Sequence, residues 1–132
     1  EEQILRENLN KDNIALIKLV APTTPEQRLK KICDIGTGYI YCLNYSGTTG
    51  VKSANLNDVN NLVNKIKKFS KIPICSGFGI KTPDDAKNIS STNIQGVIVG
   101  TAFVDFIEKN LNDKQLPENI GKITKNFVKE LR

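Results

Sequence analysis

Residues 76–86 have the sequence SGFGIKTPDDA, and residues 96–104 have the sequence GVIVGTAFV. Each stretch places a glycine-bearing turn directly behind a short apolar run, and runs of this length and branching are typical of buried parallel strands. The glycines let the chain turn sharply and expose backbone N–H groups, and exposed N–H groups at the positive end of a helix make a phosphate site. The two stretches therefore predict neighbouring phosphate-binding loops, formed by Gly79 and by Gly100 with Thr101.

The rest of the chain alternates strand and helix patterns in the same way. Apolar runs predict four strands, at residues 14–20, 39–43, 72–75 and 96–99. Helical patterns follow the strands at 26–33, 57–69, from 82 onward and at 101–110. Residues 1–10 have the pattern of the end of a helix. After the last of the four helices, a polar break is expected at 112–118 and a final amphipathic helix at 120–131. Thr24-Pro25-Glu26 and Thr82-Pro83-Asp84 repeat one pattern, a hydroxyl cap followed by proline, which predicts two helix starts.

Strands that are each followed by a helix predict an α/β fold with a parallel sheet. Four βα units are half of a TIM-type (βα)8 barrel, in which the phosphate site typically lies in the last two βα loops. A small doubly wound sheet is the alternative, but the Gly-x-Gly-x-x-Gly fingerprint after the first strand is missing. We therefore expect residues 1–132 to form a C-terminal (βα)4 half-barrel that carries the phosphate-binding loops, with the N-terminal half absent.

A half-barrel would leave two strand edges and one sheet face open. The outer strands are expected to be residues 14–20 and 96–99, because the strand order should follow the sequence. The open inner face should lie near Leu16, Lys18, Tyr41, Cys75 and Ile98 or their alternating neighbours. Open edges and faces of this kind invite association, so the isolated chain should dimerise, aggregate or stay loosely packed.

Composition excludes several classes of protein. The net charge of +5 comes from lysines that fall mostly on exposed faces of the predicted helices, which argues against a nucleic-acid footprint. No apolar run approaches the ~20 residues needed to cross a membrane, and the acidic start Glu1-Glu2-Gln3 is unlike a secretion signal. These features predict a cytoplasmic protein. The chain has no methionine, which together with the half-barrel count favours a segment of something longer.

Few side chains in this sequence are suited to acid–base or metal chemistry. Histidine is absent, and the three cysteines show no metal-type spacing and are expected to be reduced core residues. Asp84 and Asp85 fall in the first turn of a helix, where they complement its dipole, and no paired carboxylates follow a strand. We therefore expect no catalytic residue, no metal and no cofactor in this chain.

Two further features could shape a substrate pocket. The segment from Asn44 to Leu56 is long, polar and glycine-rich, so it could be a lid, and Gly50 could offer another N–H group to a phosphate. Tyr39 and Tyr41 alternate along one strand and can face the same side of the sheet. Each could be a packed core tyrosine or a wall for a planar substrate.

At this point the sequence resembles a known family. Residues 21–28 (APTTPEQR), Gly38-Tyr39-Ile40-Tyr41 with residues 46–50 (SGTTG), residues 73–86 and residues 96–102 (GVIVGTA) are together similar to the second half of the tryptophan synthase alpha subunit. The resemblance covers nearly the whole chain in order. It implies a barrel enzyme, a lyase of tryptophan biosynthesis that cleaves indole-3-glycerol phosphate to indole and glyceraldehyde 3-phosphate.

The resemblance also implies roles for single residues. Backbone groups of Gly50, Gly79, Gly100 and Thr101 would hold the phosphate. Tyr41 would match an active-site tyrosine, Phe78 would line the same pocket, and Thr49 would be a lid threonine that contacts the catalytic aspartate. The partner would be a pyridoxal-phosphate-containing beta subunit that receives the indole.

Some features depart from the family pattern. The family's catalytic glutamate and aspartate belong to the first half of the barrel, which is absent, so this segment alone should be inactive. The usual Gly-Val-Thr-Gly of the lid is Gly47-Thr48-Thr49-Gly50 here, and Tyr45 stands where arginine is common. Two alternatives remain: another phosphate-substrate barrel, such as a thiamin-phosphate or histidine-pathway enzyme, and a non-catalytic phosphate-binding scaffold.

Overall fold

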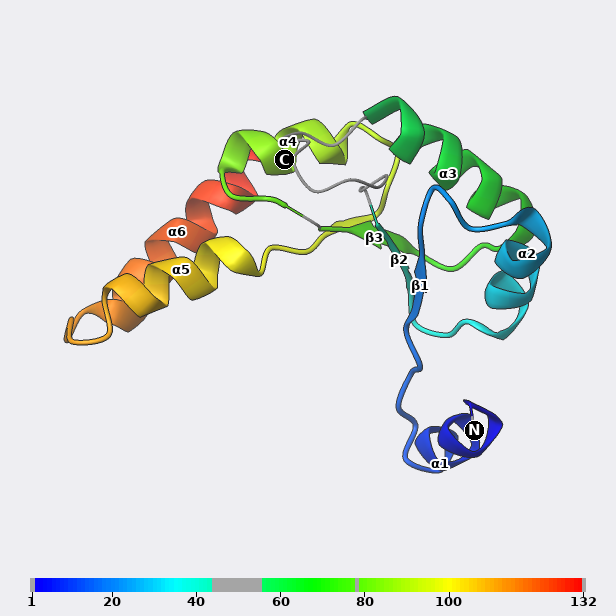
Figure 1. The fold of residues 1–132 in the computed structure, drawn as a ribbon. Coiled ribbons are helices and arrows are strands. Elements are labelled where there is room, and N and C mark those ends of the chain that lie inside the picture. Colours follow the sequence, from blue (N-terminus) through cyan, green and yellow to red (C-terminus); the bar gives the residue numbers. More distant parts are fainter. Residues whose placement is uncertain (1, 44–55, 78, 132) are drawn as a thin grey trace.

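A computed structural model describes residues 2–43, 56–77 and 79–131 of the chain (Figure 1). Its centre is a four-stranded parallel sheet in the order β1-β2-β3-β4. The strands are β1 (Lys18–Val20), β2 (Ile40–Cys42), β3 (Ile74–Ser76) and β4 (Gly96–Val97). The predicted parallel sheet, with its strands in sequence order, is confirmed, and the strands are shorter than the apolar runs that predicted them.

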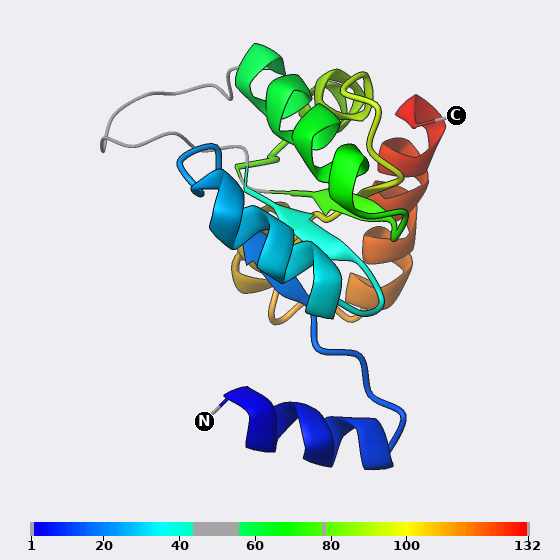
Figure 2. The same ribbon diagram turned by 90° about the vertical axis from the view of Figure 1, so that its right-hand side faces the viewer.

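Six helices complete the described part of the chain. They are α1 (Glu2–Lys11), α2 (Glu26–Ile35), α3 (Leu56–Phe69), α4 (Pro83–Ser90), α5 (Thr101–Lys109) and α6 (Leu116–Glu130). Figures 1 and 2 show α2, α3 and α4 on one side of the sheet, while α1 lies apart from it at the N-terminal end. The arrangement is that of βα units whose crossover helices all cover the same face.

The core lies between the sheet and these helices. The amphipathic α3 turns its apolar stripe of Val59, Leu62, Val63 and Ile66 inward, and all four side chains are buried. From the sheet, Val20, Ile40, Cys42 and Ile74 point to the same side and are buried. Since apolar burial is the main favourable term in folding, one covered sheet face holds this fold together.

The opposite face of the sheet is covered by none of the described helices, and we call it the bare face. The register aligns Leu19 with Tyr41, Tyr41 with Cys75 and Cys75 with Gly96, so these residues form one row across all four strands. Leu19 is 59% exposed, and Tyr41 and Cys75 are half-buried. The expected open inner face is therefore present. Its member in β1 is Leu19, because Lys18 pairs with Ile40 and shares the side covered by helices.

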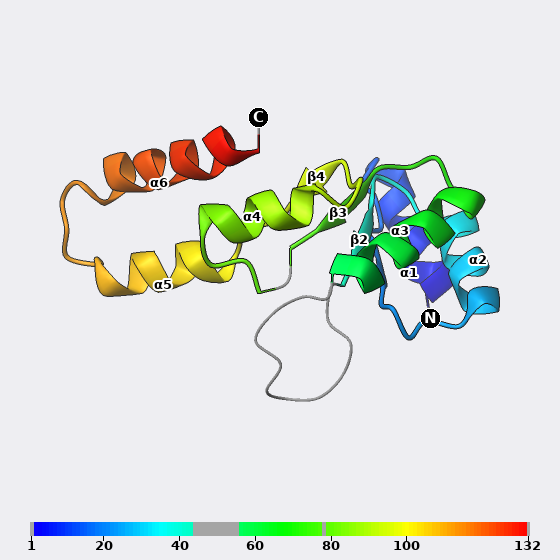
Figure 3. The same ribbon diagram turned by 90° about the horizontal axis from the view of Figure 1, so that it is seen from above.

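The two C-terminal helices form a pair that extends beyond the sheet (Figure 3). The rings of Phe103 in α5 and Phe127 in α6 lie 5.7 Å apart between centroids. An ion pair of 2.9 Å between Lys87 and Glu130 joins α6 to α4. Both side chains of this pair reach solvent, so the pair contributes little stability.

The predicted polar break at residues 112–118 was wrong at its C-terminal end, because α6 begins at Leu116. Pro117 fits the first turn of a helix, where its missing N–H group is not needed. The Asp113 carboxylate accepts hydrogen bonds from the backbone N–H of Gln115, at 2.8 Å, and from the side-chain amide of Asn119, at 3.0 Å. A local carboxylate therefore organises a helix start inside a polar segment.

The two Thr-Pro helix starts differ. Thr82 caps α4 as predicted, since its hydroxyl oxygen accepts a hydrogen bond from the Asp85 N–H. Thr24 does not cap α2; its hydroxyl oxygen accepts from the N–H of Ala21 at 2.9 Å, and the capping position is taken by Pro25. The same three-residue pattern thus makes a helix cap in one place and closes a turn in the other.

None of the helices described here is long and apolar enough to cross a membrane. All three cysteines are free thiols, as expected; Cys33 and Cys42 are buried, and Cys75 is half-buried.

Candidate functional site

The ends of β3 and β4 lie in direct contact at the carboxyl edge of the sheet. The Ile98 N–H donates a 2.9 Å hydrogen bond to the carbonyl oxygen of Ser76. A Cβ atom at Gly77 would lie 2.6 Å from the Cβ of Ile98 and closer still to its carbonyl oxygen. Position 77 must therefore be glycine, because only the missing side chain lets the two strand ends approach this closely.

A buried hydroxyl joins the end of β2 to the end of β3. The Ser76 hydroxyl is fully buried and donates a 2.8 Å hydrogen bond to the carbonyl oxygen of Cys42. The Leu43 N–H in turn donates to the carbonyl oxygen of Val20 at 2.8 Å. Hydrogen bonds thus run across the carboxyl ends of all four strands, and they fix the bases of the loops that follow.

Gly79 has a backbone conformation that favours glycine. Its φ angle is +77°, a region that other L-residues rarely adopt, and a Cβ atom there would meet nothing within 4 Å. Its backbone is exposed beyond the end of β3. The conformation and the open space in front of it leave room for a ligand to approach the main chain.

The N-terminus of α4, just beyond this loop, is already satisfied from within the chain. The backbone N–H groups of Lys81 and Thr82 donate to one carboxylate oxygen of Asp85, at 3.1 and 2.9 Å. Burial alone would raise the pKa of Asp85, but these hydrogen bonds, that of the Thr82 side chain and the charge of Lys81 outweigh it and lower the pKa below its ordinary value. The N–H groups of Lys81, Thr82 and Asp85 at the start of α4 are therefore already bonded within the chain.

The N-terminus of α5 is different. Gly100 is its N-cap residue and makes no side-chain capping bond, and its carbonyl oxygen accepts from the N–H groups of Phe103 and Val104. A Cβ atom at Gly100 would meet nothing within 4 Å, and both Gly100 and Thr101 are exposed. A helix terminus of this kind, with free space before it, suits a small anion.

The structure places three of the predicted phosphate ligands at one edge of the sheet. Gly79 follows β3, while Gly100 and Thr101 follow β4, the neighbouring strand. Gly50, Thr49 and Phe78 lie outside the described residues. The sequence did not predict that Asp85 occupies the α4 terminus, although the Thr82-x-x-Asp85 spacing is a capping-box signal that could have revealed it.

Tyr41 lies on the bare face of the sheet and not in the helix-covered core. Burial, and then the neighbouring Tyr39, raise the pKa of its phenol above the ordinary value, so it is neutral at physiological pH. A neutral ring on this face can pack against a planar apolar group. Tyr41 is therefore outside the helix-covered core, and its role as a pocket wall stays a prediction.

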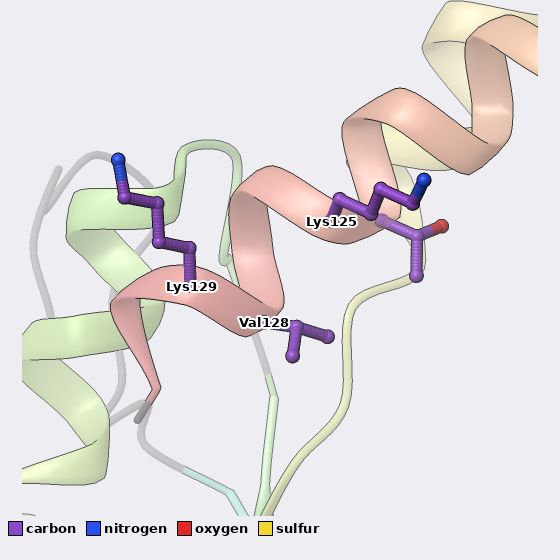
Figure 4. A pocket seen from close by; sticks show the side chains of 4 residues that line it. Lys125, Val128 and Lys129 are labelled. Carbon is purple, nitrogen blue, oxygen red and sulfur yellow. The ribbon is translucent and has the colours of Figure 1, made fainter.

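The described residues offer no metal site, and a surface hollow among them lies away from the predicted site residues. No group of three or more acidic, cysteine or histidine side chains there could hold a metal ion. One surface hollow is lined by Thr124, Lys125, Val128 and Lys129 of α6 (Figure 4). None of the predicted site residues lines it, so the hollow is separate from the strand ends.

Comparison with known proteins adds an independent result. The family model of the tryptophan synthase alpha chain matches residues 1–131. The chain is 42% identical over 103 residues to the tryptophan synthase alpha chain of Methanocaldococcus jannaschii, covering 78% of this chain and 36% of that protein. It is 36% identical over 128 residues to the Petrotoga mobilis protein of the same name, covering 96% of this chain and 49% of that protein.

Solved structures agree with this result. A crystal structure of tryptophan synthase from M. tuberculosis matches 100% of this chain and 46% of its own, with a TM-score of 0.80 and 25% identity. The tryptophan synthase alpha subunit of Campylobacter jejuni matches 82% of this chain and 43% of its own, with a TM-score of 0.73 and 39% identity. The chain thus spans less than half the length of the relatives it matches, and the predicted half-barrel fold is confirmed.

Proposed function

Because this chain belongs to the tryptophan synthase alpha chain family, we propose that it supplies the phosphate-binding half of a lyase acting on indole-3-glycerol phosphate. The products are indole and glyceraldehyde 3-phosphate. The observation that carries the proposal is the pairing of Gly79, at φ +77°, with the uncapped N-terminus of α5 on neighbouring strand ends.

The phosphate is held by backbone groups. N–H groups of Gly79, Gly100 and Thr101 donate to its oxygens, and the Thr101 hydroxyl adds another donor. The positive end of the α5 dipole favours the anion. Hydrogen bonds to a charged group contribute about 1.5–3 kcal/mol each, so three or four of them suffice for a small phosphate ester. By family resemblance, Gly50 adds an N–H group from the segment after β2.

The indole ring lies against the bare face of the sheet. Tyr41 forms part of the wall with its neutral phenol, and by family resemblance Phe78 lines the same pocket while Thr49 belongs to the lid over it. The residues paired with Tyr41 on the neighbouring strands are Leu19 and Cys75, so the bare face is apolar on both sides of Tyr41. An apolar surface next to an anion site matches a substrate with an aromatic ring at one end and a phosphate at the other.

The proton transfers need groups from a second segment. Cleaving the bond between indole and the glycerol chain requires protonation of the ring and removal of a hydroxyl proton, and each general acid–base step contributes about 10²–10⁴-fold. In this chain the Asp85 carboxylate is engaged at α4. By family resemblance, the N-terminal half of the barrel supplies the catalytic carboxylates and completes the sheet. The full barrel then passes indole to a tryptophan synthase beta subunit.

The test is the release of indole from indole-3-glycerol phosphate. The 132-residue chain alone should show none. A fusion of this chain behind the N-terminal half of the Petrotoga mobilis relative should release indole, and Gly100→Val in that fusion should raise KM far more than it lowers kcat. Turnover by the chain alone would contradict the proposal, and so would a folded fusion that binds phosphate yet releases no indole.

A further inference from the structure

Two buried hydroxyl groups in the described part of the chain are bonded in different ways. Ser76 and Thr92 are the buried polar side chains among the described residues, and both are fully buried. The Thr92 hydroxyl donates at 2.6 Å to the carbonyl oxygen of Ile89, three residues earlier in the last turn of α4. The Ser76 hydroxyl donates at 2.8 Å to the carbonyl oxygen of Cys42, 34 residues earlier on the neighbouring strand. The first bond is local, whereas the second joins two elements that are far apart in the chain.

The bond from Ser76 lies where the sheet ends. Cys42 is the last residue of β2 and Ser76 is the last residue of β3, and the register pairs them with each other. Each of these strands has three residues and β4 has two, so few backbone hydrogen bonds hold the strands together near this edge. A side-chain bond at the last pair therefore adds a fixed point at the bases of the loops that follow β2 and β3.

Ser76 also holds β4, through its main chain. Its carbonyl oxygen accepts the 2.9 Å hydrogen bond from the Ile98 N–H, and Ile98 lies two residues before Gly100, the N-cap residue of α5. On the other side, its hydroxyl bonds to Cys42, which directly follows Tyr41, the proposed wall for the indole ring. One residue is thus bonded to the strand behind each end of the proposed substrate site.

The Ser76 side chain does not reach the substrate itself. Successive side chains of a strand point to opposite faces, and Cys75 shares the bare face with Tyr41. The Ser76 hydroxyl therefore lies on the face that the helices cover, where the residue is fully buried. A buried hydroxyl is costly unless it is bonded, so this side chain favours the arrangement in which the end of β2 stays within hydrogen-bond distance of β3.

We propose that Ser76 is a positioning residue for the two ends of the substrate. Its hydroxyl fixes the wall at Tyr41 relative to the phosphate loop at Gly100, so that one molecule reaches both. This inference rests on the proposed function and adds a requirement that the phosphate site alone does not have. Loss of the hydroxyl weakens the action on a ligand that spans both ends, and it leaves unchanged the binding of a simple phosphate ester.

The test uses the fusion with the N-terminal half of the Petrotoga mobilis relative. In Ser76→Ala, kcat/KM for indole-3-glycerol phosphate should fall about fivefold, the equivalent of one neutral hydrogen bond, while the Kd of glycerol 3-phosphate should not change. Ser76→Thr keeps a hydroxyl on a side chain suited to strands and should restore kcat/KM. Thr92→Val is the matched control, because it removes the other buried hydroxyl at nearly constant volume. It should lower the melting temperature as Ser76→Ala does and leave kcat/KM unchanged.

Equal losses for both ligands in Ser76→Ala would overturn the positioning role, because the change would then act on the phosphate loop or on the whole fold. An unchanged kcat/KM would overturn it too, as would a loss that Thr92→Val reproduces or that a folded Ser76→Thr variant retains. Should Ser76→Ala fail to fold, Ser76→Cys keeps the size with only a weak donor and should separate the two ligands in the same way.

The two proposals fail in different ways. An unsubstituted fusion that is folded but releases no indole overturns the lyase function, and the positioning role falls with it. An active fusion in which the Ser76 variants do not separate the two ligands overturns the positioning role alone.

Discussion

Gly77 packs against the backbone of Ile98 so closely that no side chain fits between the ends of β3 and β4. This contact aligns the two loops that carry the candidate phosphate ligands. The obstacle at position 77 is main chain, which cannot turn aside as a flexible side chain can. The spacing of the two loops therefore depends on a residue that contributes no donor of its own to the proposed site.

Gly77→Ala should accordingly destabilise the chain strongly. Forcing a methyl group against the Ile98 carbonyl separates β3 from β4, at a cost of about 3 kcal/mol, the upper part of the range for overpacked positions. Urea denaturation of both chains at one protein concentration measures the difference. Gly121→Ala is the matched control, since a Cβ there meets nothing within 4 Å in the interior of α6. It should stabilise the chain by roughly 0.5–1 kcal/mol. Equal effects of the two changes would contradict the packing described here.

Gly79→Ala separates backbone strain from steric overlap. The added methyl group has open space around it, but the φ of +77° disfavours any residue with a Cβ. A left-handed conformation costs about 1–2 kcal/mol, so the loss of stability should lie between the effects of the other two glycine changes. A loss as large as that of Gly77→Ala would show that the loop is packed against something at this position.

Asp85 should make the stability of α4 depend on pH. Its folded pKa lies below the ordinary value, so its contribution is fully present above pH 4 and is lost as the pH falls through the lowered pKa. At pH 7, Asp85→Ala should cost about 1 kcal/mol, as loss of a helix cap does. Thermal denaturation between pH 7 and pH 2 should show the two chains converging at the acid end. A difference that stays constant to pH 2 would mean that the carboxylate is not the group that satisfies Lys81 and Thr82.

Two substitutions at the start of α5 test whether this helix terminus binds phosphate. A Cβ atom at Gly100 meets no atom of the described residues within 4 Å, so Gly100→Val should keep the fold while it fills the space before α5 and blocks phosphate. Thr101→Ala removes one hydroxyl donor and leaves the backbone donors in place, so it should weaken phosphate binding by about tenfold, the lower end of what a hydrogen bond to a charged group contributes, without abolishing it. Calorimetric titration with glycerol 3-phosphate measures both. Unchanged binding by Gly100→Val would exclude the α5 terminus.

The periodicity of the sequence was enough to predict the sheet, its parallel sense and the helices, because each apolar run and each amphipathic stripe is local. Which residues of β1 face the helices could not be predicted from the sequence. Residues 14–20 are apolar on both sides of Lys18, so alternation could not show whether Lys18 or Leu19 faces the helices. Only pairing with Ile40 and Tyr41 in the next strand decides it.

Contacts between residues far apart in the chain could not be predicted from the sequence either. The glycine at position 77 was recognised as a turn residue, but its approach to Ile98, 21 positions later, follows from the sheet order. Thr24 and Thr82 occur in the same pattern and act differently, because Thr24 finds a backbone donor at Ala21. The candidate loops could be proposed from the sequence because a glycine before a helix has a meaning that depends on local sequence, whereas the packing that positions the loops depends on distant residues.

The most direct test of the phosphate-binding half-barrel is the response of the backbone amides to phosphate. In an NMR titration of the 132-residue chain with inorganic phosphate, we expect saturable shifts centred on the amides of Gly79, Gly100 and Thr101, and none in Gly100→Val. The amides of Lys81 and Thr82, which donate to Asp85, should shift less. Shifts confined to lysine-rich helix faces, or saturable shifts that persist in Gly100→Val, would contradict the account.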